Sequence, residues 1–138
     1  MPNDAPQPAS ETPPTLMVVE PDILVRMVVA EYLRECGYFV IEGLTADDVL
    51  TILGDGRKLD IVFTEVQLIG TMDGFALARW IRQNHPDIDV ILTSGAARAA
   101  DKAGDLCDEG PLEKPYHPQD VLRRIHLLRE RRKTTPKS

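Results

Sequence analysis

The sequence is poor in aromatic residues and cysteine, and it has no long apolar segment. Aromatic residues make up only 5% of the chain, and the cysteines are Cys36 and Cys107. These two are not spaced as CxxC and have no His or Cys near them at metal-ligand spacing, which excludes a disulfide framework and a zinc site. No apolar run approaches the roughly 18 residues of a membrane span, and no signal peptide opens the chain. We therefore expect a cytoplasmic protein with reduced thiols that has no contact with a membrane.

The chain has the size and composition of one soluble globular domain. It has 138 residues, of which 43% are hydrophobic and 28% charged. A chain of this length buries a sizeable core without disulfides or metal. The net charge is −6, but residues 123–138 alone carry +6, which leaves −12 on the rest. An acidic body argues against nucleic-acid binding, and cations at the end of a last helix complement its macrodipole.

Proline distribution and charge divide the chain into three parts. Residues 1–14 hold five prolines and no apolar periodicity, so we expect a flexible leader. The globular domain is expected over residues 15–131, and a flexible basic tail over residues 132–138.

Within the domain, short apolar runs alternate with stretches of helical periodicity. Strands are predicted at residues 16–19, 38–41, 61–64 and 88–93 and near Leu112, and helices over residues 23–36, 45–53, 75–85, 96–103 and from 117 onward. Strands that read as continuous apolar runs are typical of a sheet buried on both faces. The alternation therefore predicts an α/β fold, a doubly wound five-stranded parallel sheet with helices on both faces.

Chemically active side chains follow several of these strands where each strand ends. Glu20 and Asp22 follow the first strand, Glu65 the third and Ser94 the fourth, while Lys114 follows the fifth. Because functional sites of such sheets lie outside the carboxyl ends of the strands, we expect these groups to converge on one edge. Carboxylates that could hold Mg²⁺, a hydroxyl donor and a lysine are what phosphoryl transfer requires.

Five stretches of residues 15–131 resemble the receiver domain of two-component response regulators. They are Leu16–Glu20, Leu59–Glu65, Met72–Gly74, Ile91–Gly95 and Lys114–Tyr116. The resemblance implies a flavodoxin-like (βα)5 receiver fold with strand order 2-1-3-4-5. It also implies a single-domain bacterial receiver that works in phosphorelay signal transduction.

The resemblance assigns roles to individual positions of this chain. Glu65 stands at the phosphoacceptor position, which is an aspartate in the family, and Ser94 and Lys114 stand at the positions that contact the phosphoryl group. Glu20 matches the first metal-binding acid, and Gln67 matches the position whose backbone carbonyl helps to hold Mg²⁺.

Several positions depart from the family pattern. Pro21 replaces the second metal-binding acid, Asp22 sits one place later, and Pro111 stands at the aromatic switch position. Mg²⁺ binding is therefore expected to be weak or absent, because this ion requires oxygen ligands. We expect the longer side chain of Glu65 to reach Lys114 within salt-bridge range, about 4 Å.

Three interpretations of Glu65 remain open. The site is decayed and only the fold is kept, or the carboxylate imitates the phosphorylated state, or Glu65 itself accepts phosphate. The expected function is a non-enzymatic signalling module that binds a histidine kinase or another signalling protein through its fourth helix, fifth strand and fifth helix. The alternative is an Mg²⁺-dependent phosphotransferase or phosphatase on a similar α/β scaffold, which would need an aspartate nucleophile.

Overall fold

A computed structural model describes residues 13–94 and 112–134. The elements are β1 (Thr15–Val19), α1 (Ile23–Glu35), β2 (Phe39–Gly43), α2 (Ala46–Gly54), β3 (Ile61–Glu65), α3 (Gly74–Asn84), β4 (Asp89–Ser94), β5 (Leu112–Glu113) and α5 (Pro118–Thr134). The helix predicted over residues 96–103 and the switch position Pro111 lie outside the described residues.

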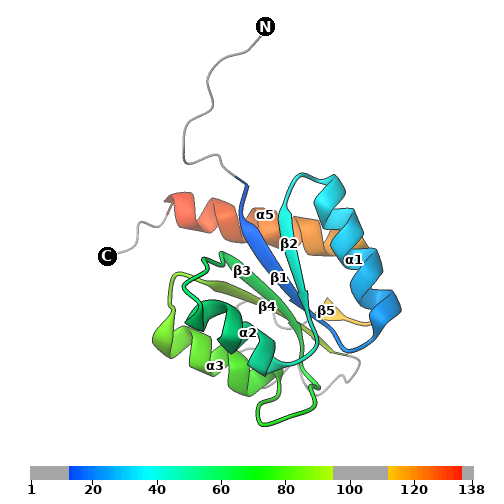
Figure 1. The fold of residues 1–138 in the computed structure, drawn as a ribbon. Helices are drawn as coiled ribbons and strands as arrows, with labels where there is room; N and C mark the ends of the chain where they lie inside the picture. Colours follow the sequence, from blue (N-terminus) through cyan, green and yellow to red (C-terminus); the bar gives the residue numbers. More distant parts are fainter. Residues whose placement is uncertain (1–12, 95–111, 135–138) are drawn as a thin grey trace, which may run out of the picture.

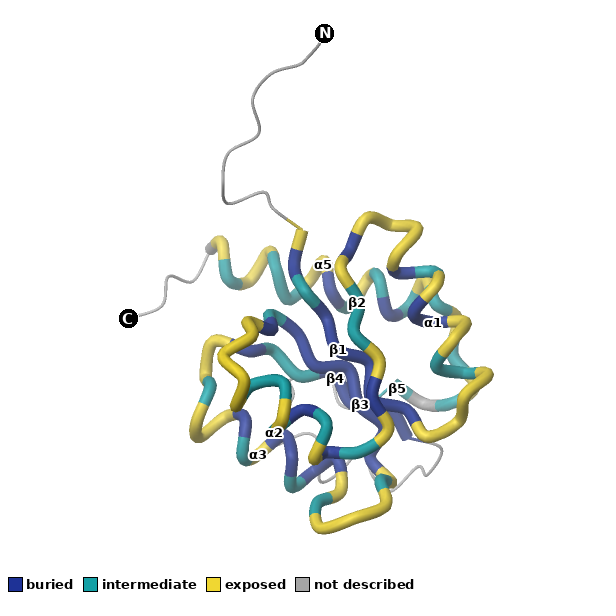
Figure 2. The backbone as a smooth tube through the Cα atoms, viewed as in Figure 1, coloured by how far each residue is buried: buried dark blue, intermediate teal, exposed yellow. Residues whose placement is uncertain are grey.

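The strands form one parallel sheet in the order β2-β1-β3-β4-β5. This order confirms the doubly wound fold predicted from the alternation of strands and helices. Helices α1 and α5 cover one face, and α2 and α3 cover the other (Figure 1). The central strands β1 and β3 are buried almost throughout (Figure 2), which explains their continuous apolar sequences.

Local capping explains where the helices begin. The Asp22 carboxylate accepts hydrogen bonds from the backbone N–H groups of Leu24 and Val25 at the start of α1. Asp73 accepts one from Ala76 at the start of α3. Such side chains satisfy N–H groups that have no partner within the helix. Each cap fixes the turn between a strand end and the following helix.

The last helix is longer than the sequence led us to expect. α5 continues to Thr134, three residues beyond the expected domain boundary at residue 131. Arg132 lies in this extension and forms a bidentate ion pair with Asp89 at the start of β4, with both N–O distances at 2.8 Å. This contact holds the final turn of α5 against the sheet. None of the helices in residues 13–94 and 112–134 has the continuous apolar stretch that a membrane span requires.

Candidate functional site

Lys114 lies at the carboxyl edge of the sheet, between acids from two other strands. Its backbone N–H donates to the carbonyl oxygen of Ser94 at 3.0 Å, which continues the pairing of β5 with β4. Its Nζ lies 2.6 Å from Oε1 of Glu20, after β1, and forms a second ion pair with Oε1 of Glu65, at the end of β3. The sheet therefore brings together the groups that the strand ends predicted, including the expected pair of Glu65 and Lys114.

The remaining oxygen of each carboxylate is held by the backbone. Oε2 of Glu20 accepts from the N–H of Asp22, and Oε2 of Glu65 accepts from the N–H of Gln67, both at 2.9 Å. The two glutamates are only 2% and 6% exposed. Burying a carboxylate is costly unless its oxygens have partners, and here each oxygen has a backbone N–H or the Lys114 ammonium beside it; Oε1 of Glu20 has the ion pair with Lys114 and no hydrogen bond in the described residues. The arrangement thus fixes both acids in one orientation.

The electrostatic environment favours the charged form of Lys114. Burial by itself would lower the pKa of the ammonium group, but the contacts in which it donates to the carboxylates of Glu20 and Glu65, together with the negative charges of these acids, outweigh burial and raise the pKa. Lys114 is therefore a permanent cation at neutral pH. Two acids and one lysine leave a net negative charge at this edge of the sheet.

The carboxylates that could hold a magnesium ion are engaged with groups of the protein. A divalent cation needs free oxygen ligands, and the four carboxylate oxygens of Glu20 and Glu65 already have N–H or ammonium partners. Pro21 contributes no carboxylate. Asp22 uses its side chain to cap α1. Over residues 13–94 and 112–134, no three acidic, His or Cys side chains group as a metal site would require. The ammonium of Lys114 supplies the positive charge between the acids.

Two hydroxyl residues at the end of β4 complete the inner wall of the site. Ser94 is 1% exposed, and its neighbour Thr93 lies opposite Glu65 in the sheet. Oγ1 of Thr93 is buried and has no hydrogen-bond partner among the residues described. The sequence predicted that Ser94 lies at the site. It did not single out Thr93, which has the pattern of an ordinary buried strand residue.

Tyr116 closes the site on the side of α5, and sequence reasoning did not single it out. Its ring packs edge-on against Phe63, with centroids 5.8 Å apart. Its hydroxyl is buried, with no hydrogen-bond partner in the described part of the chain. Burial, followed by the negative charges of Glu20 and Glu65, raises the pKa of this phenol far above its usual range. Tyr116 is therefore a neutral, hydrophobic wall of the site.

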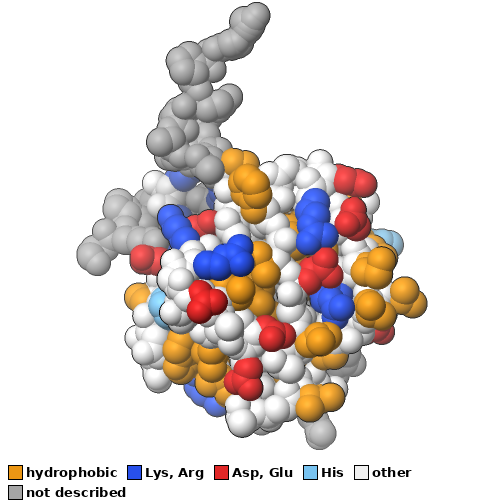
Figure 3. All heavy atoms as spheres, in the orientation of Figure 1, with side chains coloured by type: hydrophobic (Ala, Val, Ile, Leu, Met, Phe, Trp, Pro, Cys, Tyr) orange, Lys and Arg blue, Asp and Glu red, His pale blue; other side chains and the backbone are white. Residues whose placement is uncertain are grey.

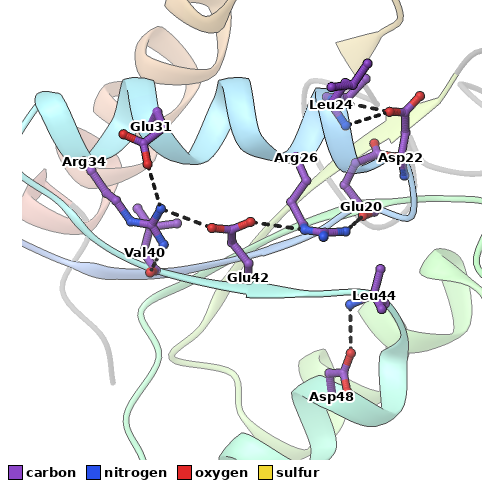
Figure 4. Close-up of polar contacts among 11 residues, drawn as sticks. Glu20, Asp22, Leu24, Arg26, Glu31, Arg34, Val40, Glu42, Leu44 and Asp48 are labelled. Atoms are coloured by element: carbon purple, nitrogen blue, oxygen red, sulfur yellow. Dashed lines mark hydrogen bonds and ion pairs between the residues drawn. The ribbon is translucent and has the colours of Figure 1, made fainter.

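Arg26 supports the site from α1 and was also missed. Its Nη1 donates to the carbonyl oxygen of Glu20 at 2.8 Å, and its Nε pairs with Glu42 of β2 at 3.2 Å. Glu42 in turn pairs with Arg34, at 3.1 Å, so the charged groups form a chain along β2 (Figure 4). Helical periodicity alone gives no sign of this network, because its members are ordinary polar residues of a helix face and an edge strand.

Gly74 allows α3 to begin directly beside Glu65. Its N–H donates to the carbonyl oxygen of Val66 at 2.7 Å. A Cβ at this position would lie 2.7 Å from Cα of Val66 and would also clash with the carbonyl oxygen of Glu65. Only glycine lets the start of α3 lie this close to β3 without displacing the backbone of Glu65 and Val66.

Comparison with known families identifies the family of this chain and confirms its fold. The family model described as "Response regulator receiver domain" matches residues 16–126. The chain is 32% identical, over 120 residues, to the sensor kinase CckA of Brucella abortus (strain 2308), covering 85% of this chain and 13% of that protein. It is 27% identical to the protein PetR of Rhodobacter capsulatus, covering 88% of this chain and 51% of that one. The chain thus spans about half or less of the length of these relatives.

Solved structures of receiver domains have the same architecture. The BeF3-activated receiver domain of DrrB is 26% identical, with a TM-score of 0.73, and covers 86% of this chain and 99% of its own. A signal receiver domain of an HD domain-containing protein from Pseudomonas fluorescens Pf-5 has a TM-score of 0.77 at 23% identity, with 88% and 98% covered, and shows likeness of fold alone. With the family model matching most of the chain, this protein belongs to the response regulator receiver domain family of two-component systems.

Proposed function

We propose that this receiver domain signals through a permanent internal charge rather than through phosphorylation. The observation that carries the proposal is the bridging position of Lys114, whose ammonium pairs with the carboxylates of both Glu20 and Glu65. By resemblance, this lysine contacts the phosphoryl group in receivers. In this chain the carboxylate of Glu65 supplies a negative charge to it without a kinase.

The free energy of the contact between Lys114 and Glu65 is sufficient to bias a conformational equilibrium. A hydrogen bond to a charged, partly desolvated group contributes about 1.5–3 kcal/mol. A free-energy difference of about 1.5–3 kcal/mol shifts a two-state equilibrium roughly 10- to 150-fold. We therefore propose that the domain rests near its active-like conformation.

The partner is proposed to be a kinase or another signalling protein. Receiver domains interact with such proteins in general. The proposed contact surface consists of the fourth helix of the family fold together with β5 and α5, in the cytoplasm. Mg²⁺ binds at the phosphorylation site of receiver domains in general, and we propose that it binds weakly in this one, because the carboxylate oxygens are already engaged.

The substitution Glu65→Gln tests the proposal, since it keeps the length of the side chain and removes its charge. We expect faster amide hydrogen exchange around Ser94 and Leu112 and weaker binding of the signalling partner. Glu35→Gln, on the exposed end of α1, is the matched control and should change neither. If Glu65→Gln also leaves both measurements unchanged, the site is decayed and the internal charge has no signalling role.

A second test asks whether phosphorylation can be restored. We expect intact mass to show no added phosphate after incubation with acetyl phosphate and Mg²⁺. The double variant Glu65→Asp with Pro21→Asp restores the aspartate and the missing metal-binding acid, and should gain one phosphate. A phosphate on the unchanged protein would instead identify Glu65 as an acceptor and overturn the proposal.

A further inference from the structure

A groove of about 480 Å³ lies at the edge of the sheet, remote from the carboxyl ends of the strands. It runs along β2 beside the start of β1, and we call it the β2 groove. Its lining includes Thr15, Phe39, Ile41, Arg34 and Arg57. Figure 3 shows hydrophobic and basic side chains next to one another on the face that carries β2.

The β2 groove offers an exposed aromatic ring and an uncompensated positive charge. Phe39 is 63% exposed, so its ring is accessible to an occupant of the groove. Arg34 is neutralised by Glu31 and Glu42 and donates to the carbonyl oxygen of Val40 (Figure 4). Arg57 has no ion pair with any residue that the structure describes. An occupant with proline or apolar side chains and a negative charge would complement both features.

The first residues of this chain have that chemistry. Residues 1–12 contain Pro2, Pro6 and Pro8, the acids Asp4 and Glu11, and no Lys, Arg or His. Proline-rich segments favour the polyproline II conformation and bind grooves lined by aromatic rings, because little backbone freedom is lost on binding.

The path of the chain brings this segment to the groove. Thr15, the first residue of β1, is itself part of the lining. Three residues lie between Glu11 and Thr15. The chain between them makes four steps of at most about 3.5 Å each, so a tether no longer than about 14 Å joins Glu11 to the lining of the groove. A tether this short gives the segment an effective concentration at the groove on the order of millimolar. Even a weak contact between the segment and the groove is then formed much of the time.

We propose that residues 1–12 of this chain occupy the β2 groove, with Glu11 paired to Arg57 and the prolines packed on Phe39. The segment then covers the apolar ring at the edge strand of the sheet, a position where exposed strands otherwise pair with other chains. This proposal is independent of the charge on Glu65, since the β2 groove lies at the other end of the strands.

Cleavage by a glutamate-specific protease at the bond between Glu11 and Thr12 tests the proposal on the full chain. When opening is fast, cleavage follows the population of the open segment. We expect cleavage about tenfold slower than in a free peptide of residues 1–14. Arg57→Gln should speed it about two- to fivefold, the contribution of an exposed ion pair. Phe39→Ala should also speed it.

Arg79→Gln is the matched control, because Arg79 is an exposed arginine of α3 outside the groove, and it should not change the rate. Intact mass identifies the cleaved bond in each case. Equal rates for the unchanged protein, Arg57→Gln and the free peptide would overturn the proposal. Protection that grows with protein concentration would also overturn it, because the occupant would then be the segment of a second copy.

Discussion

At the scale of single residues, the site depends on an unusual balance of charge. Two buried glutamates share one lysine, and every carboxylate oxygen has a partner. The desolvation cost of the acids is therefore offset only while Lys114 is present. The backbone N–H groups of Asp22 and Gln67 orient the acids but bring no full positive charge.

Lys114→Met should destabilise the fold by about 3 kcal/mol, because it leaves two buried carboxylates without their cation. Urea unfolding at pH 7 measures the change. Lys58→Met is the matched control, since Lys58 is 86% exposed in its side chain and should cost almost nothing.

Glu65→Gln added to Lys114→Met should recover part of the loss, because one unpaired carboxylate is removed. A double variant as unstable as the sum of the two single variants would contradict the shared-cation account.

At the scale of elements, the contact between α3 and β3 sets the position of Glu65. Gly74→Ala should destabilise the protein by about 1–3 kcal/mol, since the new Cβ would clash with the backbone of Glu65 and Val66. Gly54→Ala, at the end of α2, has nothing within 4 Å and should be neutral or slightly stabilising. Thermal unfolding of both variants measures the difference, and equal effects would argue against a tight approach of α3.

The final turn of α5 is a second element held by one contact. Arg132→Ala removes the bidentate pair with Asp89 and should cost about 1.5–3 kcal/mol, because the pair is partly buried. Arg123→Ala removes an exposed pair with Asp120 on the same helix and should change stability by less than about 1 kcal/mol. Hydrogen exchange in the last turn of α5 should increase only in the first variant, and an equal increase in both would contradict this role.

At the scale of the whole molecule, the raised pKa values predict loss of stability at alkaline pH. The ordinary pKa values are 10.5 for Lys114 and 10.0 for Tyr116, and both are raised in the folded protein. At a pH above these ordinary values, Lys114 and Tyr116 therefore keep their protons in the folded state, whereas the unfolded chain has lost them. Their contribution is complete below about pH 10 and is lost as the pH rises through the folded pKa values.

Urea midpoints between pH 7 and 11 measure this dependence. We expect a plateau up to about pH 10 and a decline above it. Tyr116→Phe removes one of the two titrating groups and should make the decline shallower. A decline of unchanged slope in this variant would show that other groups cause it.

The sequence by itself determined the fold class and most of the site. Continuous apolar strands alternating with amphipathic helices permit only a covered parallel sheet, and parallel strands carry their end residues to one edge. Glu20, Glu65, Ser94 and Lys114 could therefore be grouped before any contact was known. The helix starts predicted at residues 23, 45 and 75 lie within one residue of the observed starts at Ile23, Ala46 and Gly74.

Only the tertiary structure decided which partner each polar group takes. Arg26 and Glu42 are distant in sequence and look like ordinary surface residues, yet the packing of α1 on β2 turns them into a support for Glu20. The packing of Tyr116 against Phe63 makes this ring a wall of the site. The ion pair between Arg132 and Asp89 holds the last turn of α5, which ends at Thr134. Periodicity reports which face of an element is buried, whereas pairing across elements depends on distances that the folded chain alone creates.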